Sequence, residues 1–449
     1  MLGSITNFFD RMVRRYLPDA FLFAIILTFV VFILGIVFTK NSPVEMVGYW
    51  GGGFWGLLTF AMQMSLIVVT GYILANSPIV KKLLERISRL ANTPGQAVIL
   101  VTVVAIIACL INYGFGLVVG ALLAIHVAKR VPSADYRLLM ASAYSGFLVW
   151  HGGLSGSVPL TIATEGHFLQ EKMGLISVTQ TIFGGMNLFI VGTLLVSLPI
   201  LNSLLMKSKQ GTGSIDPELL QLQQTRMEAT EKEEEEIINK EEQTPAERLE
   251  NSKLISLLIG FLGLAFVIYH FVSNGFDLNL NIVNFTFLFL GILFHGTPRN
   301  FLNSVNGAVK NAGGIIIQFP FYAGIMGMML DSGLSDQLSE WFVSISNEFT
   351  LPWLSFISAG ILNFFVPSGG GQWSIQGPIM IDAALNLGAD TAKTAMAVAW
   401  GDAWTNMIQP FWALPLLAIA GLKVRDIMGF CVMVLFWSFI PISIGLLFF

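Results

Sequence analysis

Residues 362–372 read LNFFVPSGGGQ, and residues 404–410, about forty positions further on, read WTNMIQP. The first half of the chain carries a matching pair, because residues 110–116 read LINYGFG and residues 150–160 read WHGGLSGSVPL. Each stretch places Gly, Pro or polar residues inside an apolar segment, where they interrupt a helix. Such backbone is tolerated at membrane depth only where protein buries it or a cavity hydrates it. A matched pair of interruptions, one in each half, is typical of the binding site of a secondary transporter.

The composition is that of a polytopic membrane protein. The chain has 449 residues, of which 54% are hydrophobic and 12% charged, and its mean hydropathy is +0.72. Several apolar stretches exceed the ~20 residues of one crossing, so we expect hairpins or broken helices within them. Cys109 and Cys431 are the only cysteines, which excludes a disulfide framework and a cysteine metal cluster. The expected partners are the lipid bilayer and a small solute, and no nucleic acid.

The basic residues predict the topology, because Lys and Arg near the ends of membrane segments collect on the cytoplasmic side. Almost all of them can lie in the cytoplasm if segment 97–130 enters and leaves the membrane on the same side. This condition predicts a hairpin over 97–130 that opens to the cytoplasm. The same reasoning predicts a hairpin over 352–390 that opens outward, an N-terminus inside and a C-terminus outside.

The expected fold class is an all-α polytopic membrane protein with two inverted-topology repeats. Gln63 and Gln318 lie mid-span in corresponding segments, and Ser77 and Ser332 open amphipathic helices at the same offset. The first repeat covers 1–206, with scaffold helices 17–75, an interfacial helix 78–91, the hairpin 97–130, a broken helix 139–163 and a helix 174–206. A charged cytoplasmic linker 207–253, acidic over 228–250, and a connecting helix 254–273 follow. The second repeat covers 280–449, with an interfacial helix 334–347, the hairpin 352–390, a broken helix 391–421 and a helix 427–449.

The first candidate site is the break in the helix over 139–163, expected between Trp150 and Val158. Its substrate-binding candidates are small or carry a hydroxyl: Gly152, Gly153, Ser155 and Ser157. Glycines let the backbone unwind without steric cost, and the restarting helix offers unpaired amides to an anion. Ordinary Gly and Ser packing between membrane helices is the alternative. His151 either donates to an anion when protonated or is a hydrogen-bonded packing residue.

The second candidate site is the break in the helix over 391–421, where Thr405 and Asn406 follow Asp402. A carboxylate inside an apolar stretch is a functional residue by default. Asp402 could take up a proton, or join freed carbonyls around Na⁺; a shallow helix cap is the alternative. Thr405 and Asn406 are candidates for both the substrate and the coupling ion. We expect H⁺ or Na⁺ as the coupling ion and no other cofactor.

The tip of the outward hairpin is the most specific motif. Pro367 ends the first arm, and Gly369, Gly370 and Gly371 permit a tight turn lined by amides. The side chains that can donate to a carboxylate there are Ser368, Gln372 and Ser374. Tryptophans in these segments either wall an apolar pocket or anchor at the interface: Trp150, Trp373, Trp400, Trp404 and Trp412. Asn112 and Asn363 each precede a hairpin tip, where a side-chain amide can bind ion or substrate.

Charge restricts the substrate. No Arg or Lys lies deep in either candidate site, so a di- or tricarboxylate would be poorly neutralised. Amides, hydroxyls and half-helix N-termini with apolar walls suit a small monocarboxylate with a short hydrocarbon tail.

Four motifs together resemble the bacterial short-chain fatty acid transporter family: VPSGGGQW at 366–373, WTNMIQPFW at 404–412, WHGGLSGS at 150–157 and DRMVRRYLPD at 10–19. That family is similar to the ion transporter superfamily, which implies two inverted repeats with one re-entrant hairpin each, a homodimer and elevator-type motion. In that superfamily, Ser-Asn-Thr motifs at hairpin tips and broken helices bind Na⁺ and carboxylate. Here Asn363 precedes the tip, the broken helix reads Thr405-Asn406, and the first half has no such triplet.

The sequence therefore predicts a symporter of the bacterial cytoplasmic membrane that takes up monocarboxylates such as butyrate or acetoacetate with H⁺ or Na⁺. A C4-dicarboxylate carrier of the same superfamily is disfavoured by the missing deep cations. An anion channel would need a continuous polar pore, whereas the polar residues gather at two matched interruptions. We do not expect an enzyme, because the sequence has no evident His/Cys metal spacing or Ser/His/Asp order.

Overall fold

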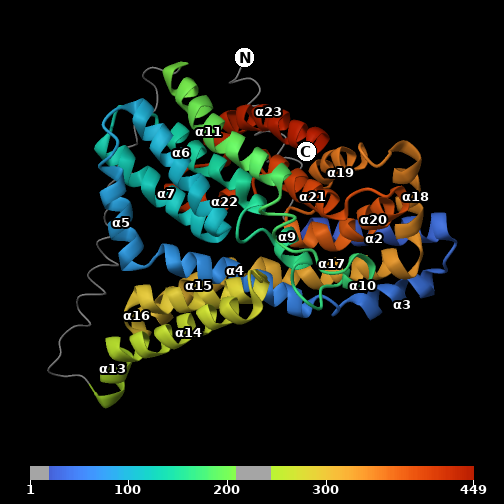
Figure 1. The fold of residues 1–449 in the computed structure, drawn as a ribbon, viewed down its shortest axis with the longest axis horizontal. Helices are drawn as coiled ribbons and strands as arrows, with labels where there is room; N and C mark the ends of the chain where they lie inside the picture. Colours follow the sequence, from blue (N-terminus) through green and yellow to red (C-terminus); the bar gives the residue numbers. More distant parts are fainter. Residues whose placement is uncertain (1–19, 209–243) are drawn as a thin grey trace.

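The computed structural model describes residues 20–208 and 244–449, and all regular secondary structure in these ranges is helical (Figure 1). The amphipathic segment 1–19 and the acidic part of the expected linker lie outside the described residues. Eight of the described helices are long and apolar enough to cross a membrane, and two shorter apolar helices accompany them. The expected all-helical membrane fold is confirmed.

Ser or Thr followed by Pro starts five of the described helices. The hydroxyl accepts a hydrogen bond from a free amide of the first turn, and Pro at the first helical position loses no hydrogen bond. These helices are α3 (Pro43–Gly53), α5 (Pro78–Ser88), α6 (Pro94–Ile111), α13 (Pro245–Glu250) and α16 (Pro298–Ala308).

The remaining elements complete two similar series. The first series contains α2 (Ala20–Thr39), α4 (Leu58–Ala75), α7 (Tyr113–Arg130), α8 (Tyr136–Ser145), the 3₁₀ helix η1 (Gly146–Gly152), α9 (Ser157–Ile162), α10 (Gln170–Met173) and α11 (Gly185–Ser208). After α14 (Lys253–Asn274), the second contains α15 (Leu280–His295), η2 (Val309–Asn311), α17 (Gly313–Asp331), α18 (Leu334–Ile345), α19 (Leu351–Leu362), α20 (Gly369–Leu387), α21 (Thr391–Thr405), α22 (Ala413–Ala420) and α23 (Val424–Phe448).

Two short helices between the long ones were missed by the sequence analysis. α3 and α16 have 11 residues each, and their first residues, Pro43 and Pro298, are separated by the same 255 positions as Gln63 and Gln318. Both are too short and too polar to register as membrane segments. Their positions give the two series the same order: long helix, short helix, long helix, amphipathic helix, hairpin, broken helix and final helix.

The two series are interleaved in space. α4 of the first series packs against α15 and α16 of the second, while α17 of the second packs against α2 and α3 of the first. Each of these central helices also contacts the second arm of its own hairpin, α4 with α7 and α17 with α20. In Figure 1, α15 and α16 lie against α4 on one side of the molecule, with α14 packed against α15, and the first hairpin lies on the other side. The hairpins and broken helices therefore meet around a shared interior.

One expected element boundary is wrong, and one helix that begins where expected has a different N-cap. The final helix of the first series begins at Gly185 rather than near residue 174, because residues 174–184 are not helical and 178–183 form turns. Helix α18 starts after Gly333, which has a left-handed backbone conformation and is its N-cap. Ser332 supports that start by accepting the Leu334 N–H at 3.2 Å.

Candidate substrate and ion site

Asn112 makes the first hairpin turn without a loop. It ends α6 and caps α7, with its Oδ1 accepting the Phe115 N–H at 2.9 Å. Its Nδ2 donates to the Ile67 carbonyl of α4 at 3.2 Å. This fully buried amide is therefore hydrogen-bonded through both its oxygen and its nitrogen.

The first hairpin is bonded to the first helix break. The Leu154 N–H donates to the Leu110 carbonyl at 2.6 Å, and Ser155 Oγ accepts the Tyr113 N–H at 2.9 Å. Gly153 permits this contact, because a Cβ there would overlap the Leu110 carbonyl. The Ser155 hydroxyl is thus hydrogen-bonded to the hairpin. The hydroxyl of Ser157, at the start of α9, is buried without a hydrogen-bond partner.

Asp402 is the centre of the buried polar group. It lies in the last turns of α21 with 1% of its surface exposed. His151 Nε2 of η1 lies 3.1 Å from Asp402 Oδ2, and Asn406 Nδ2 donates to the same oxygen at 3.1 Å. Asp402 Oδ1 and His151 Nδ1 are buried without partners. The sequence analysis named both residues but gave no reason to pair them, since they lie 251 positions apart.

Asn363 joins the second hairpin to the second helix break. Its Nδ2 lies 3.0 Å from the Asp402 carbonyl, from Thr405 Oγ1 and from Asn406 Oδ1. Thr405 Oγ1 in turn donates to the Gly360 carbonyl of α19 at 2.9 Å. The side-chain oxygen of Asn363, Oδ1, is buried without a hydrogen-bond partner. Four residues expected to bind an ion or substrate therefore form one cluster.

The second hairpin tip differs from the expected tight turn. Gly369, Gly370 and Gly371 form the first turn of α20, capped by Ser368, and none of them has a positive φ. They are required for close approach instead. A Cβ on Gly369 would overlap His151 Nε2 and lie 2.8 Å from Ser157 Oγ. The tip of the second hairpin thus touches the break of the first half.

Two expected donors of the tip face elsewhere. Gln372 Nε2 donates to the Ala359 carbonyl at 2.9 Å and to Gln376 Oε1 at 3.0 Å, so this amide ties α20 to α19. Ser374 Oγ donates to the Gly371 carbonyl at 2.7 Å. Trp373 is fully buried, and its indole N–H has no partner.

Asn187 of α11 was missed by the sequence analysis. Its Nδ2 donates to the Gly152 carbonyl at 3.0 Å, and its Oδ1 accepts the Trp400 indole N–H at 3.1 Å. A Cβ on Gly152 would lie 2.8 Å from Asn187 Oδ1. Asn187 thus connects the two broken helices. In the sequence, its one sign was a single side-chain amide inside an apolar helix.

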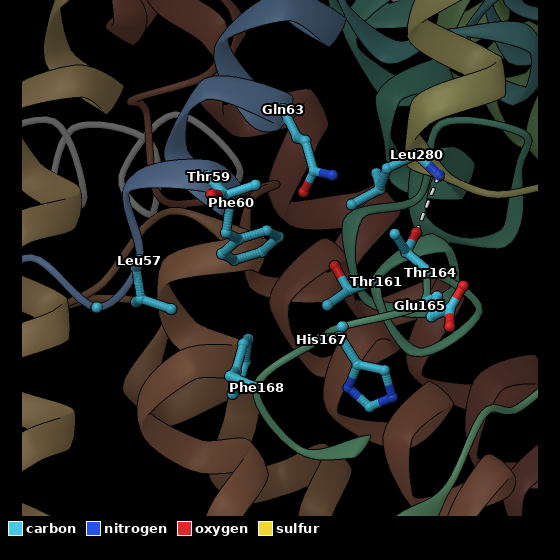
Figure 2. A pocket seen from close by; sticks show the side chains of 12 residues that line it. Leu57, Thr59, Phe60, Gln63, Thr161, Thr164, Glu165, His167, Phe168 and Leu280 are labelled. Atoms are coloured by element: carbon cyan, nitrogen blue, oxygen red, sulfur yellow. Dashed lines mark hydrogen bonds between the residues drawn. The ribbon is translucent and has the colours of Figure 1, made fainter. Parts of the chain in front are cut away.

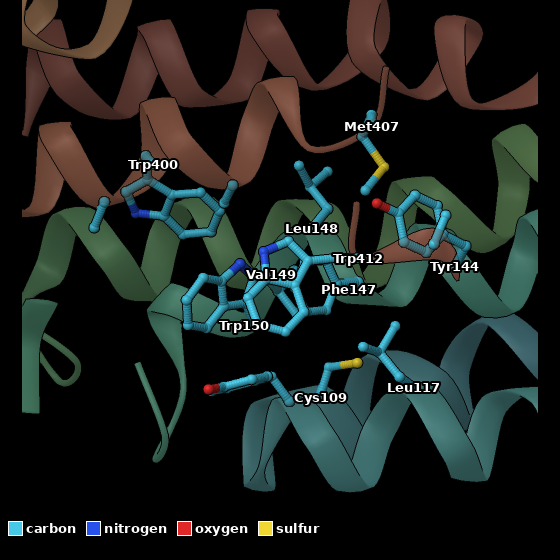
Figure 3. Packing of buried hydrophobic residues seen from close by; sticks show 14 of the residues in the cluster. Cys109, Leu117, Tyr144, Phe147, Leu148, Val149, Trp150, Trp400, Met407 and Trp412 are labelled. Carbon is cyan, nitrogen blue, oxygen red and sulfur yellow. The ribbon is translucent and has the colours of Figure 1, made fainter. Parts of the chain in front are cut away.

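The expected tryptophan pocket is a packed aromatic cluster. Figure 3 shows Trp150, Phe147, Trp412 and Tyr144 together in the interior. The rings of Phe147 and Trp150 stack with centroids 5.4 Å apart, and Tyr144 Oη donates to the Asn406 carbonyl at 2.7 Å. These rings belong to the buried core and pack beside the polar cluster.

A cavity of about 310 Å³ lies nearby, where α4 begins, α9 ends and α15 begins (Figure 2). We call it the α4 cavity. Its lining is Gly56, Leu57, Thr59, Phe60, Gln63, Thr161, Thr164, Glu165, Gly166, His167, Phe168 and Leu280. Burial lowers the pKa of His167, whose Nε2 lies 3.0 Å from the Gly174 carbonyl. The Phe60 ring also borders the second hairpin tip, because a Cβ on Gly370 would lie 2.9 Å from Phe60 Cζ.

The buried interior has little charge. Among the described residues, the buried ionisable side chains other than Cys and Tyr are two Asp and three His, and no Lys, Arg or Glu is buried. No group of three His, Cys, Asp or Glu that could hold a metal ion occurs in the described ranges. The partnerless oxygens of Asp402, Asn363 and Gln372 are chemically suited to a hard cation such as Na⁺.

A multi-pass helical protein whose interrupted helices converge on such a cluster belongs to the class of membrane transporters, and its fold has solved counterparts. The Alcanivorax borkumensis YdaH transporter matches with a TM-score of 0.61 at 14% identity over 96% of this chain and 98% of that one. Neisseria gonorrhoeae MtrF, described as illuminating a class of antimetabolite efflux pumps, matches with a TM-score of 0.51 at 13% identity over 99% of this chain and 96% of that one.

The family follows from sequence. The family model for short chain fatty acid transporters matches residues 1–449. Two proteins named "Putative short-chain fatty acid transporter" are similar: one from Escherichia coli (strain K12), 47% identical over 99% of both chains, and one from Haemophilus influenzae, 46% identical over 100% of both. The chain belongs to the short chain fatty acid transporter family. It is a transporter and not an enzyme.

Proposed function

We propose that this chain is a secondary active transporter that takes up short-chain fatty acids and related monocarboxylates such as butyrate and acetoacetate, coupled to H⁺ or Na⁺. The observation that carries the proposal is the meeting of the second hairpin tip with His151, Ser157 and the Asp402 cluster. Helix α20 points its N-terminus at this place, which favours a carboxylate, and Ser157 Oγ is a partnerless hydroxyl beside it.

The charge of the site supports a monocarboxylate. A second carboxylate would need a buried cation, and among the described residues the nearest candidates are His residues rather than Lys or Arg. The aromatic cluster and the Phe60 ring offer apolar surface for a short tail. In this conformation Gly369 lies directly against His151, so the tip must withdraw before a carboxylate can enter.

The architecture we propose is two inverted repeats, each with a re-entrant hairpin, that work by an elevator motion in a homodimer of the bacterial inner membrane. The common element order and the exchanged packing of α4 and α17 support the repeats. The distribution of Lys and Arg supports a cytoplasmic N-terminus and an external C-terminus. With that orientation the α4 cavity leads from outside toward the tip, with the Phe60 ring between them.

Counterflow in proteoliposomes tests the proposal. Vesicles preloaded with unlabelled acetoacetate should take up labelled acetoacetate faster than protein-free vesicles, and butyrate should compete. Acetoacetate is the better label because it is the stronger acid, so less of it crosses lipid in the neutral form. Competition by succinate but not by butyrate would support the C4-dicarboxylate alternative and refute ours.

A further inference from the structure

Among the described residues, His151–Asp402 is the one acid–base pair whose two side chains are both buried. The exposed fractions of the two side chains are 0% and 1%, and their atoms lie 3.1 Å apart. The pair joins η1 to α21, so it links the helix breaks of the two halves. If Nε2 donates to Asp402, the free Nδ1 is an acceptor in neutral imidazole and a donor only in the protonated ring.

No other titratable group of the described ranges that lies near the pair supplies a charge that would balance the charge of Asp402. Tyr113 of α7 and Tyr144 of α8 lie near Asp402, and Cys109 and Cys431 lie near Tyr144; phenols and buried thiols are ordinarily neutral at pH 7. The charged side chains of the surrounding helices are remote from the pair along their helices: Lys129 and Arg130 of α7, Arg137 of α8, Asp382 of α20, Lys393 of α21, and Arg425 and Asp426 of α23. Of these, Asp382 pairs with Lys172, and Arg137 lies 3.9 Å from Asp426.

Charge counting then links the anion to a proton. With neutral His151 and ionised Asp402 the pair carries one negative charge, and a carboxylate beside it would make two buried negative charges without a cation. Such uncompensated burial is strongly unfavourable. One added proton neutralises the pair and turns His151 Nδ1 into a donor. The loaded site then carries the same net charge as the empty site.

We infer that the His151–Asp402 pair carries the coupling proton, and that His151 Nδ1–H, present only in the protonated pair, donates to the substrate carboxylate. The inference rests on the proposed transport function and names its coupling ion. The proton enters from the outer solution with the anion, stays on the pair while the anion is bound, and leaves with it inside. His151 is therefore both a coupling residue and a substrate ligand.

The test compares the wild-type protein with His151→Gln and Asp402→Asn in proteoliposomes. An inside-alkaline pH gradient should drive the wild type to accumulate labelled acetoacetate about tenfold or more above protein-free vesicles, with no requirement for Na⁺. Both variants should lose this accumulation and exchange substrate more slowly than the wild type, because each removes a member of the pair that binds the proton and, through His151 Nδ1–H, the anion. Matched controls are His295→Gln and Asp135→Asn. His295 bonds the Ile73 carbonyl and Asp135 caps α8, both away from the pair.

A measurement on the wild type alone keeps the inference falsifiable if a variant fails to fold. Calorimetric titration with acetoacetate in buffers of different ionisation enthalpy should show about one proton taken up per anion bound. Three results would overturn the proton inference but not the transport function: counterflow without proton uptake, accumulation driven only by a Na⁺ gradient, or parental accumulation by either variant. Absence of wild-type counterflow would instead refute the transport function itself.

Discussion

Gly369→Ala is the sharpest probe of the second hairpin tip. The new methyl group would overlap His151 Nε2 and lie 2.5 Å from His151 Cε1 and 2.8 Å from Ser157 Oγ. The imidazole cannot easily move aside, because it is bonded to Asp402 and its centroid lies 3.6 Å from that of Trp150. The tip must shift instead, which disfavours the closed conformation, in which Gly369 packs against His151.

The size of the effect follows from the cost of overpacking. An extra methyl in a well-packed site costs about 1–3 kcal/mol, and each 1.36 kcal/mol corresponds to a factor of ten. The closed conformation should therefore be depleted about 5- to 150-fold relative to the open one. If substrate passes through the closed conformation, the initial rate of acetoacetate counterflow should fall by a comparable factor.

The control is Gly192→Ala in α11, where a Cβ would meet nothing within 4 Å. Both variants should appear in the membrane at the parental level, and Gly192→Ala should exchange at the parental rate. A Gly369→Ala protein that exchanges as fast as its parent would refute the reasoning that the tip closes on His151.

The remaining predictions concern other parts of the chain. Gly370→Val should abolish counterflow, since even its Cβ would lie 2.9 Å from Phe60 Cζ, and Phe60→Ala in the same chain should restore part of it; equal losses in the single and double variants would contradict this cause. Ser133→Cys should react with an impermeant maleimide only from the cytoplasmic side, because the basic residues place its loop there; labelling from outside would overturn the repeat assignment. Asn363→Leu should lower the free energy of unfolding by about 1–3 kcal/mol, seen as a lower melting temperature in detergent, because it leaves buried acceptors unpaired; an unchanged melting temperature would argue against that network.

The helical membrane fold could be predicted from sequence because its signals are local. Long apolar segments define the crossings, and Gly, Pro and Asn within them mark the interruptions at 112, 152–156 and 363–368. The short helices α3 and α16 had local signals too, a Ser-Pro and a Thr-Pro start. Hydropathy alone conceals them, since their apolar residues are too few to span a membrane.

The contacts of the site could be predicted only in part. Asn363, Thr405 and Asn406 gather around Asp402 because the hairpin and the broken helix are neighbours in sequence. The pairing of His151 with Asp402 depends on how the halves pack, and no local pattern encodes that. Likewise, the triple glycine indicated a special backbone, but only the structure shows that close approach to His151 is the reason.

The interruptions are held by bonds of two chemical kinds, which bears on how this protein can change over generations. The first hairpin is joined to its break by the Ser155 hydroxyl and also by a main-chain bond from Leu154 to Leu110, which no side-chain replacement at either position removes. The second is joined by the side chains of Asn363 and Thr405, each of which a single codon change can remove. Inherited variation should therefore be tolerated at Leu154 and Leu110 and rejected at Gly153, whereas the second half can acquire new ion or substrate preferences through Asn363 and its neighbours.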